Sequence, residues 1–154
     1  MQLIAARAAV DRGEARAELA TYRAALALVG GDLTGTVEHA HLALARAADD
    51  DHLTTASAAA LVGLASWPTG DLDAAHDAYE VAVSHLHAAG HVADVLGCSI
   101  TLADIEMTQG RLCEAQQTCR DALELVTHDD AQPRGSSDMY VGLSRVAWER
   151  DDLA

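Results

Sequence analysis

Eight histidines are the residues of this chain that most directly suggest chemistry, because imidazole nitrogens bind metal ions. Three of them cluster at His85, His87 and His91, and the last two have the i,i+4 spacing that aligns side chains on one helix face. Gly90 lies between them and is expected to end the helix that would align them. No carboxylate or cysteine completes a familiar ligand pattern. We therefore interpret the cluster as polar positions near a helix end, and we expect no metal site and no cofactor in this segment.

The sequence also lacks the pattern of a catalytic nucleophile. Cys98, Cys113 and Cys119 form no C-x-x-C pair, and we interpret them as reduced thiols. Neither the G-x-x-x-x-G-K-[ST] phosphate loop nor G-x-G-x-x-G occurs. The acidic runs at 49–51 and 129–130 fall in expected connectors, where carboxylates serve as caps and turn residues. We therefore expect no enzyme activity and no catalytic residue.

Large apolar side chains give the better lead to a binding site. Trp67, Met107 and Trp148 recur at intervals of 40 and 41 residues, and Asp104 and Arg145 come three residues before the last two. Two indoles, a flexible thioether and one charge of each sign suit a groove for a small organic ligand or a peptide. We predict that these five residues bind a ligand or partner. The alternative is that the large side chains pack between helices.

The same interval recurs in a tripeptide. Gly31-Asp32-Leu33 returns as Gly70-Asp71-Leu72 and Gly110-Arg111-Leu112, and in weaker form as Asp151-Asp152-Leu153, so that the leucines are 39, 40 and 41 residues apart. Such a period indicates stacked supersecondary units. Each glycine is expected to end one helix in the left-handed conformation, and each aspartate to cap the next. Because the sequence ends just after the fourth copy begins, we expect residues 1–154 to form one repeat domain of a larger protein.

Helices are predicted on both sides of each turn. Apolar or small residues follow each leucine at steps that keep them on one helix face. Small residues lie nine positions before each leucine, at Ala24, Gly63, Ala103 and Ser144, where two helices must approach closely. The predicted first helices are 14–29, 52–67, 92–109 and 137–150, and the second helices are 33–47, 72–89 and 112–127. The opening ten residues are expected to belong to a second helix of a preceding unit, and Ser136 or Ser137 to cap the last helix.

Composition supports an all-helical chain. Alanine, the best helix former, accounts for 33 of the 154 residues, whereas aromatic residues make up 3% and phenylalanine is absent. β-branched and aromatic residues are too sparse for a sheet protein. The absence of lysine, asparagine and phenylalanine, whose codons are AT-rich, suggests a bacterial genome of high GC content.

Charge limits the partners. The formal net charge is −14 and all ten basic residues are arginine. DNA and anionic membrane surfaces bind through basic side chains, so we expect neither to be a partner of this segment. No apolar run reaches the roughly 18–20 residues of a membrane span, and the start lacks the pattern of a signal peptide. We expect a cytoplasmic location.

The repeat has a recognisable form. A small residue, a Gly-Asp-Leu turn and Ala-x-x-x-Tyr-x-x-Ala resemble a tetratricopeptide repeat (TPR), here at Gly63, 70–72, Ala75, Tyr79 and Ala82. The chain is more closely similar to the helical-repeat region of large ATP-dependent LuxR-family transcription regulators of the MalT type. The segments that carry this resemblance are 59–67, 70–79, 89–91, 102–105, 109–112 and 133–143. Departures from the usual pattern are Thr36 in place of alanine, Cys119 in place of an aromatic residue, and Pro68.

The resemblance implies an all-α fold, a right-handed superhelix of antiparallel helix hairpins (a TPR-like α-solenoid) with three to four repeats of 39–41 residues. It also implies a sensor or interaction domain that binds a small-molecule inducer or a regulatory protein to control transcription. The nucleotide-binding and DNA-binding domains of such regulators have no motif here. The alternative is a freestanding TPR-type scaffold that bridges proteins. Because the last repeat is incomplete, we expect self-association through the ends of the array, as a homodimer.

Overall fold

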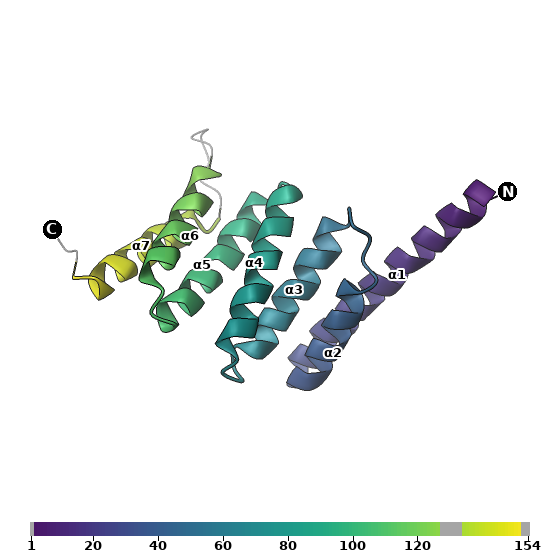
Figure 1. Cartoon of the computed structure of the whole chain (residues 1–154), viewed down its shortest axis with the longest axis horizontal. Helices are drawn as coiled ribbons and strands as arrows, with labels where there is room; N and C mark the ends of the chain where they lie inside the picture. Colours follow the sequence, from purple (N-terminus) through teal and green to yellow (C-terminus); the bar gives the residue numbers. More distant parts are fainter. Residues whose placement is uncertain (1, 127–133, 152–154) are drawn as a thin grey trace. The chain divides into compact units, whose positions relative to one another are not determined.

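The computed structural model describes residues 2–126 and 134–151, with side chains from residue 15 onward. Every regular element in these ranges is a helix, and Figure 1 shows them in chain order. The helices are α1 (Gln2–Val29), α2 (Leu33–Leu44), α3 (His52–Ser66), α4 (Leu72–Ala88), α5 (Val92–Thr108), α6 (Leu112–Glu124) and α7 (Ser136–Glu149). These bounds confirm the predicted all-α, TPR-like order of helices. None of the helices in this described part has the length and apolar character needed to cross a membrane.

Two expectations about helix ends were wrong. The opening ten residues do not form a separate helix, because α1 runs without interruption from Gln2 to Val29. Alanine-rich sequence continues through this stretch, and Gly13 alone does not stop a helix. Neither Ser136 nor Ser137 caps α7: the capping position is Gly135, whose φ is +98° and whose own Cβ position would lie 2.9 Å from the Cβ of Leu96. The close approach and the positive φ both require glycine at this position, and the helix begins at the next residue, Ser136.

The tripeptides form the same turn each time. Gly31, Gly70 and Gly110 have φ of +77°, +82° and +76°, the left-handed region that glycine enters without a steric penalty. In the first turn the amide of Asp32 donates to the carbonyl of Ala27 at 2.9 Å, which closes the helix end. In the fourth copy Asp151 adopts φ of +58° without a glycine. The leucine of that copy and the acidic pair at 129–130 lie outside the described residues.

The aspartates of the first two turns act as predicted. The carboxylate of Asp32 accepts a hydrogen bond from the amide of Gly35 at 2.8 Å, and that of Asp71 accepts one from Ala74 at 3.1 Å. Asp51, at the end of the acidic run 49–51, caps α3 in the same way. Each carboxylate satisfies a backbone donor that would otherwise lack a partner at the helix start.

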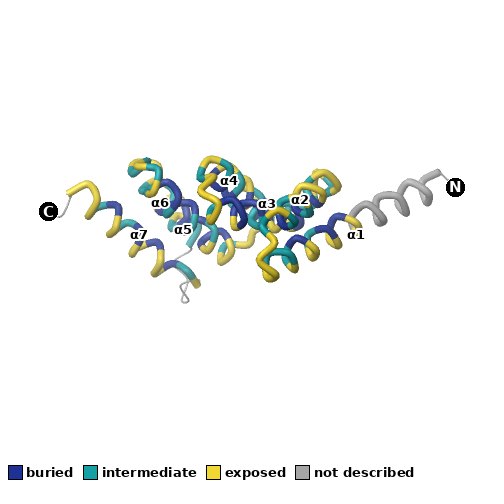
Figure 2. Tube along the Cα trace, turned by 90° about the horizontal axis from the view of Figure 1, so that it is seen from below, coloured by how far each residue is buried: buried dark blue, intermediate teal, exposed yellow. Residues whose placement is uncertain are grey.

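The chain divides into two compact units, Met1–His85 and Leu86–Ala154. In the first unit α1 packs against α2 and α3, and α2 packs against α3. The core of this unit is made of small residues, Ala20, Ala43 and Ala58 in one cluster and Ala24, Ala40 and Val62 in another. Figure 2 shows buried positions recurring along one side of each helix, as the sequence periodicity predicts.

Two departures from the repeat pattern are accommodated in the cores. Thr36 in the first unit is fully buried, and its hydroxyl donates to the carbonyl of Asp32 at 2.7 Å. In the second unit, α5 packs against α6 and α7 around Leu96, Ala103, Ala115, Cys119, Ala122, Met139 and Val146. Cys119 fills the place of an aromatic residue there, and a Cβ at Gly142 of α7 would lie 2.9 Å from its Sγ. The thiol and the glycine thus let α6 and α7 approach closely.

Candidate functional site

A hollow of about 300 Å³ lies between α5 and α7 in the second unit. Its lining includes four of the five residues that the sequence predicted to bind a ligand: Asp104, Met107, Arg145 and Trp148. They come together because α5 and α7 are the first helices of successive repeats and pack against each other. Residues at one register position of two such helices therefore become neighbours.

Asp104 and Arg145 form an ion pair across this hollow, from Oδ1 of the carboxylate to Nη1 of the guanidinium. The aspartate side chain is 29% exposed and the arginine side chain 54% exposed. A pair that solvent reaches adds little to stability. Both groups remain accessible, so they can exchange their mutual contact for polar groups of a ligand.

Trp148 makes the hollow unusual for a folded surface. Its side chain is 68% exposed, although indole is one of the largest apolar groups in proteins. Met107, across the hollow, is half-buried and packs against the core of the second unit. The hollow therefore offers a flat aromatic face and a polarisable wall beside one acid and one base, which suits a ligand with apolar and polar parts.

Trp67 lies elsewhere in the chain. It is at the C-terminal end of α3, in the first unit, where it is half-buried and its amide donates to the carbonyl of Gly63 at 3.0 Å. It does not line the hollow between α5 and α7. The ligand-binding role of all five residues stays a prediction.

A second concave region lies within the first unit and was missed by sequence reasoning. It has a volume of about 600 Å³ and is formed by α2, α3 and α4. Three of the four α3 residues that line it are small: Ala59, Ala65 and Ser66. Their spacing was visible in the sequence, but small residues on a helix face predict close packing as readily as a groove.

Two histidines of the cluster make separate side-chain contacts. Nδ1 of His85 on α4 lies 3.1 Å from Nδ1 of His52 on α3, and the two rings meet edge to face. His91 faces Asp94 on its own helix, with Nδ1 and Oδ2 3.2 Å apart. These contacts lie near the ends of α3, α4 and α5.

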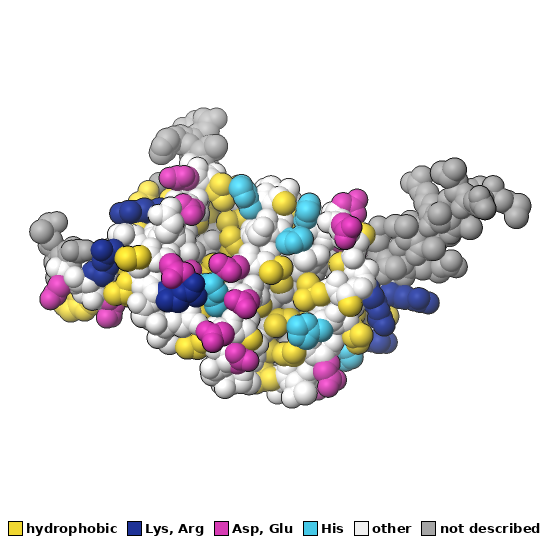
Figure 3. Space-filling view, viewed as in Figure 1, with side chains coloured by type: hydrophobic (Ala, Val, Ile, Leu, Met, Phe, Trp, Pro, Cys, Tyr) yellow, Lys and Arg dark blue, Asp and Glu magenta, His cyan; other side chains and the backbone are white. Residues whose placement is uncertain are grey.

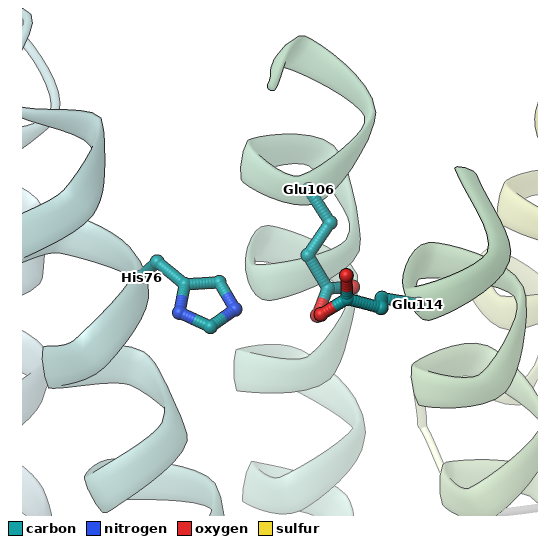
Figure 4. A group of neighbouring side chains, drawn as sticks. All are labelled: His76, Glu106 and Glu114. Atoms are coloured by element: carbon teal, nitrogen blue, oxygen red, sulfur yellow. The ribbon is translucent and has the colours of Figure 1, made fainter. Parts of the chain in front are cut away.

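Other groups of metal-ligating side chains do occur in the described ranges. On α4, Nδ1 of the buried His76 lies 3.5 Å from Oδ1 of Asp77 and 3.9 Å from Oε2 of Glu80. In the second unit, carboxylate oxygens of Glu106 and Glu114 lie within 4.8 Å of each other. Figure 4 shows these two glutamates turned toward each other from α5 and α6, and labels His76 on α4. The expectation of no metal or cofactor stays a prediction.

Glu106 is also part of a polar contact beneath the surface. Its buried carboxylate accepts a hydrogen bond from the hydroxyl of Thr118 at 2.9 Å. Burial, together with the negative charges of Glu106 and Asp104, raises the pKa of the nearby Cys119 thiol to about 11. Burial, with Asp94, also raises the pKa of Cys98. Both thiols are therefore held in the unreactive protonated form, while Cys113 is exposed.

Comparison with known proteins agrees with this architecture. The family described as the MalT-like TPR region matches residues 17–154. The chain belongs to this family. A search of curated proteins finds no match. Membership covers every described turn of the repeat and both compact units, from residue 17 of α1 onward. TPR-like helical repeats of this kind are typically interaction regions, not catalytic ones.

Proposed function

We propose that this MalT-like TPR region is the sensor domain of a LuxR-family transcription regulator in bacteria. In this role it binds a small-molecule inducer or a regulatory protein and so controls transcription from the cytoplasm. It is one domain of a longer multidomain protein, and it has no catalytic activity or cofactor of its own. Family membership supports the regulatory role, and the net charge of −14 is consistent with DNA contact being made by another domain.

The observation that carries the proposal is the exposed indole of Trp148 beside the accessible Asp104–Arg145 ion pair. A hollow of about 300 Å³ is at the lower end of the size of ligand pockets. The groups that line it are arranged for a ligand that stacks on the indole and hydrogen-bonds to the two charges. Stability alone does not require a tryptophan that is 68% exposed.

A thermal-shift screen of small metabolites tests this proposal on the chain itself. A ligand present at about 100 times its Kd adds about 2.7 kcal/mol to the free energy of unfolding, which is a readily measured rise in Tm. We expect hits that stabilise the wild type and lose their effect in the Trp148→Ala and Arg145→Ala variants. The matched control is Tyr140→Ala, because Tyr140 is an aromatic residue on the same helix, is 55% exposed and does not line the hollow.

Hits that stabilise Trp148→Ala as much as Tyr140→Ala would show that the hollow between α5 and α7 is not the binding site. The reading frame of the gene distinguishes the regulator from the alternative, a freestanding scaffold. A P-loop domain upstream and a helix-turn-helix domain downstream in the same reading frame support the regulator. An open reading frame that codes for residues 1–154 alone would support the scaffold.

A further inference from the structure

The concave region of the first unit is a groove that follows α2. The α2 part of its lining begins at Leu33 and ends at Leu44, so the groove runs the whole 12-residue length of that helix, about 18 Å at the helical rise per residue. The walls are α2 and α4 and the floor is α3, and Figure 1 shows α3 behind the two wall helices. The groove is therefore elongated, and its length is close to that of three helical turns.

Apolar side chains cover the inside of the groove. Val37 of α2, Val62 of α3, and Ala78 and Val81 of α4 contribute to its lining. Val81 is 40% exposed, although it is a large hydrophobic residue. Figure 3 shows hydrophobic side chains at the surface between α2 and α4. The small residues of the floor leave depth for the side chains of an incoming helix, and burial of such a surface favours association.

The charges around the groove are all of one sign. Its lining includes Glu38 on α2, Asp71 directly before α4 and Asp77 on α4, and all three are exposed. Among the residues that line this groove, as the structure describes it, none is lysine or arginine. The chain as a whole carries 24 acidic and 10 basic residues. The electrostatic field of the groove and that of the whole chain are thus both negative, so both attract a cationic partner and repel an anionic one.

We propose that this groove binds an amphipathic helical segment of a protein partner, with a stripe of leucine-like residues flanked by arginine or lysine. The apolar stripe, at i, i+3 and i+7, lies along the floor, and the basic residues reach the carboxylates of Glu38 and Asp77 on opposite walls. This proposal goes beyond the sensor function, because none of its residues line the hollow between α5 and α7. Either surface can fail its test without affecting the other.

Three synthetic peptides of about 14 residues test the assignment on the full chain. The first carries leucines at i, i+3 and i+7 with flanking arginines; the second replaces each arginine by glutamate; the third replaces each leucine by serine. Fluorescence anisotropy is measured with the labelled peptides. We expect binding of the first peptide, weakened by salt, and at least about tenfold weaker binding of the other two. Absence of binding by the first peptide, or equal binding by the third, would overturn the proposal.

Protein variants then locate the binding site. The double variant Glu38→Arg with Asp77→Arg is expected to weaken binding at least about tenfold. The control Asp50→Arg with Asp121→Arg makes the same change in net charge at exposed residues that do not line the groove, and should change affinity less than about twofold. Equal losses in the two double variants would show non-specific attraction and refute the site.

A steric variant keeps the test independent of charge. Ala74 lies in the first turn of α4, lines the groove and is half-buried, so Ala74→Trp should fill the groove without a change in charge. We expect loss of peptide binding with an unchanged far-UV circular dichroism spectrum. Full binding by a folded Ala74→Trp variant would contradict the proposal. Self-association that both groove variants abolish in sedimentation would identify a second copy of the chain as the occupant and overturn the assignment to a foreign segment.

Discussion

The contact between Gly63 and Tyr79 predicts that alanine lowers the free energy of unfolding at Gly63 but raises it at Gly97, which has no such contact. A Cβ at Gly63, in α3, would lie 2.6 Å from Cδ2 and 2.7 Å from Cε2 of Tyr79, and 3.4 Å from the carbonyl oxygen of Ala75. Carbon atoms in contact normally lie about 3.5–4.0 Å apart, so the overlap is about 1 Å. Tyr79 is only 3% exposed, and its stiff ring has little space to retreat. Gly63→Ala therefore forces a shift at a tightly packed contact.

The expected magnitude follows from two opposing terms. An added methyl group in a full site costs about 1–3 kcal/mol. Replacing glycine by alanine inside a helix gains about 1 kcal/mol. We therefore expect Gly63→Ala to lower the free energy of unfolding by about 1 kcal/mol. The control is Gly97→Ala, because Gly97 lies inside α5, is exposed, and has nothing within 4 Å of its Cβ position. That change should raise the free energy by about 1 kcal/mol.

Urea unfolding followed by far-UV circular dichroism measures both variants, and the two free energies of unfolding should differ by about 2 kcal/mol. The Tyr79→Leu background supplies the second arm: there Gly63→Ala should become neutral or stabilising, with a coupling energy of about 1–3 kcal/mol between the two positions. Equal stabilisation by Gly63→Ala and Gly97→Ala would refute the reasoning, because it would mean that the tyrosine ring moves aside at no cost.

Three further outcomes are expected from the same measurements. Asp71→Ala should lower the free energy of unfolding by about 1 kcal/mol, because it removes the cap of α4. Its control, Asp50→Ala, changes an exposed residue that caps no helix and should alter the free energy of unfolding by less than about 0.5 kcal/mol. The pKa of Cys119 is raised from 9.0 to about 11 in the folded chain, so the stability that the protonated thiol contributes is complete below pH 9 and is lost as the pH rises to about 11. Over that range the free energy of unfolding of the wild type should fall by about 2–3 kcal/mol more than that of Cys119→Ala. Equal losses in the two proteins would contradict the raised pKa. Trp148→Ala should cost less than about 1 kcal/mol, because its side chain is 68% exposed, and a loss of about 3–5 kcal/mol would identify it as a packing residue.

Local signals in the sequence were enough to place the helices. Glycines at 31, 70, 90 and 110 adopt the left-handed conformation, and Asp32 and Asp71 cap the helices that follow. These effects act over a few residues, so they can be deduced without the fold. The errors also lay at helix ends. The capping position is Gly135, where Leu96, far away in sequence, lies 2.9 Å from the position that a Cβ would take.

The repeat register in the sequence was enough to group residues that lie together in the structure. Asp104 and Arg145 share one register position in successive repeats, and in the structure they form an ion pair although 41 residues separate them. Repetition explains why these two residues are close, because equivalent residues on adjacent first helices are neighbours in any stacked array. The same register argument grouped Trp67 with them; that residue belongs to the first compact unit, whereas the residues that line the hollow belong to the second.

The sequence by itself determined which segments become helices and which face of each is buried, because helix periodicity, glycine conformation and capping are local properties. Tertiary structure alone decided where the packed helices leave space. The 600 Å³ groove among α2, α3 and α4 exists because small residues of α3 form a floor between two wall helices, and its acidic residues come from both walls. The depth and charge of such a surface depend on distances between helices, and these are set by side chains packing across the core.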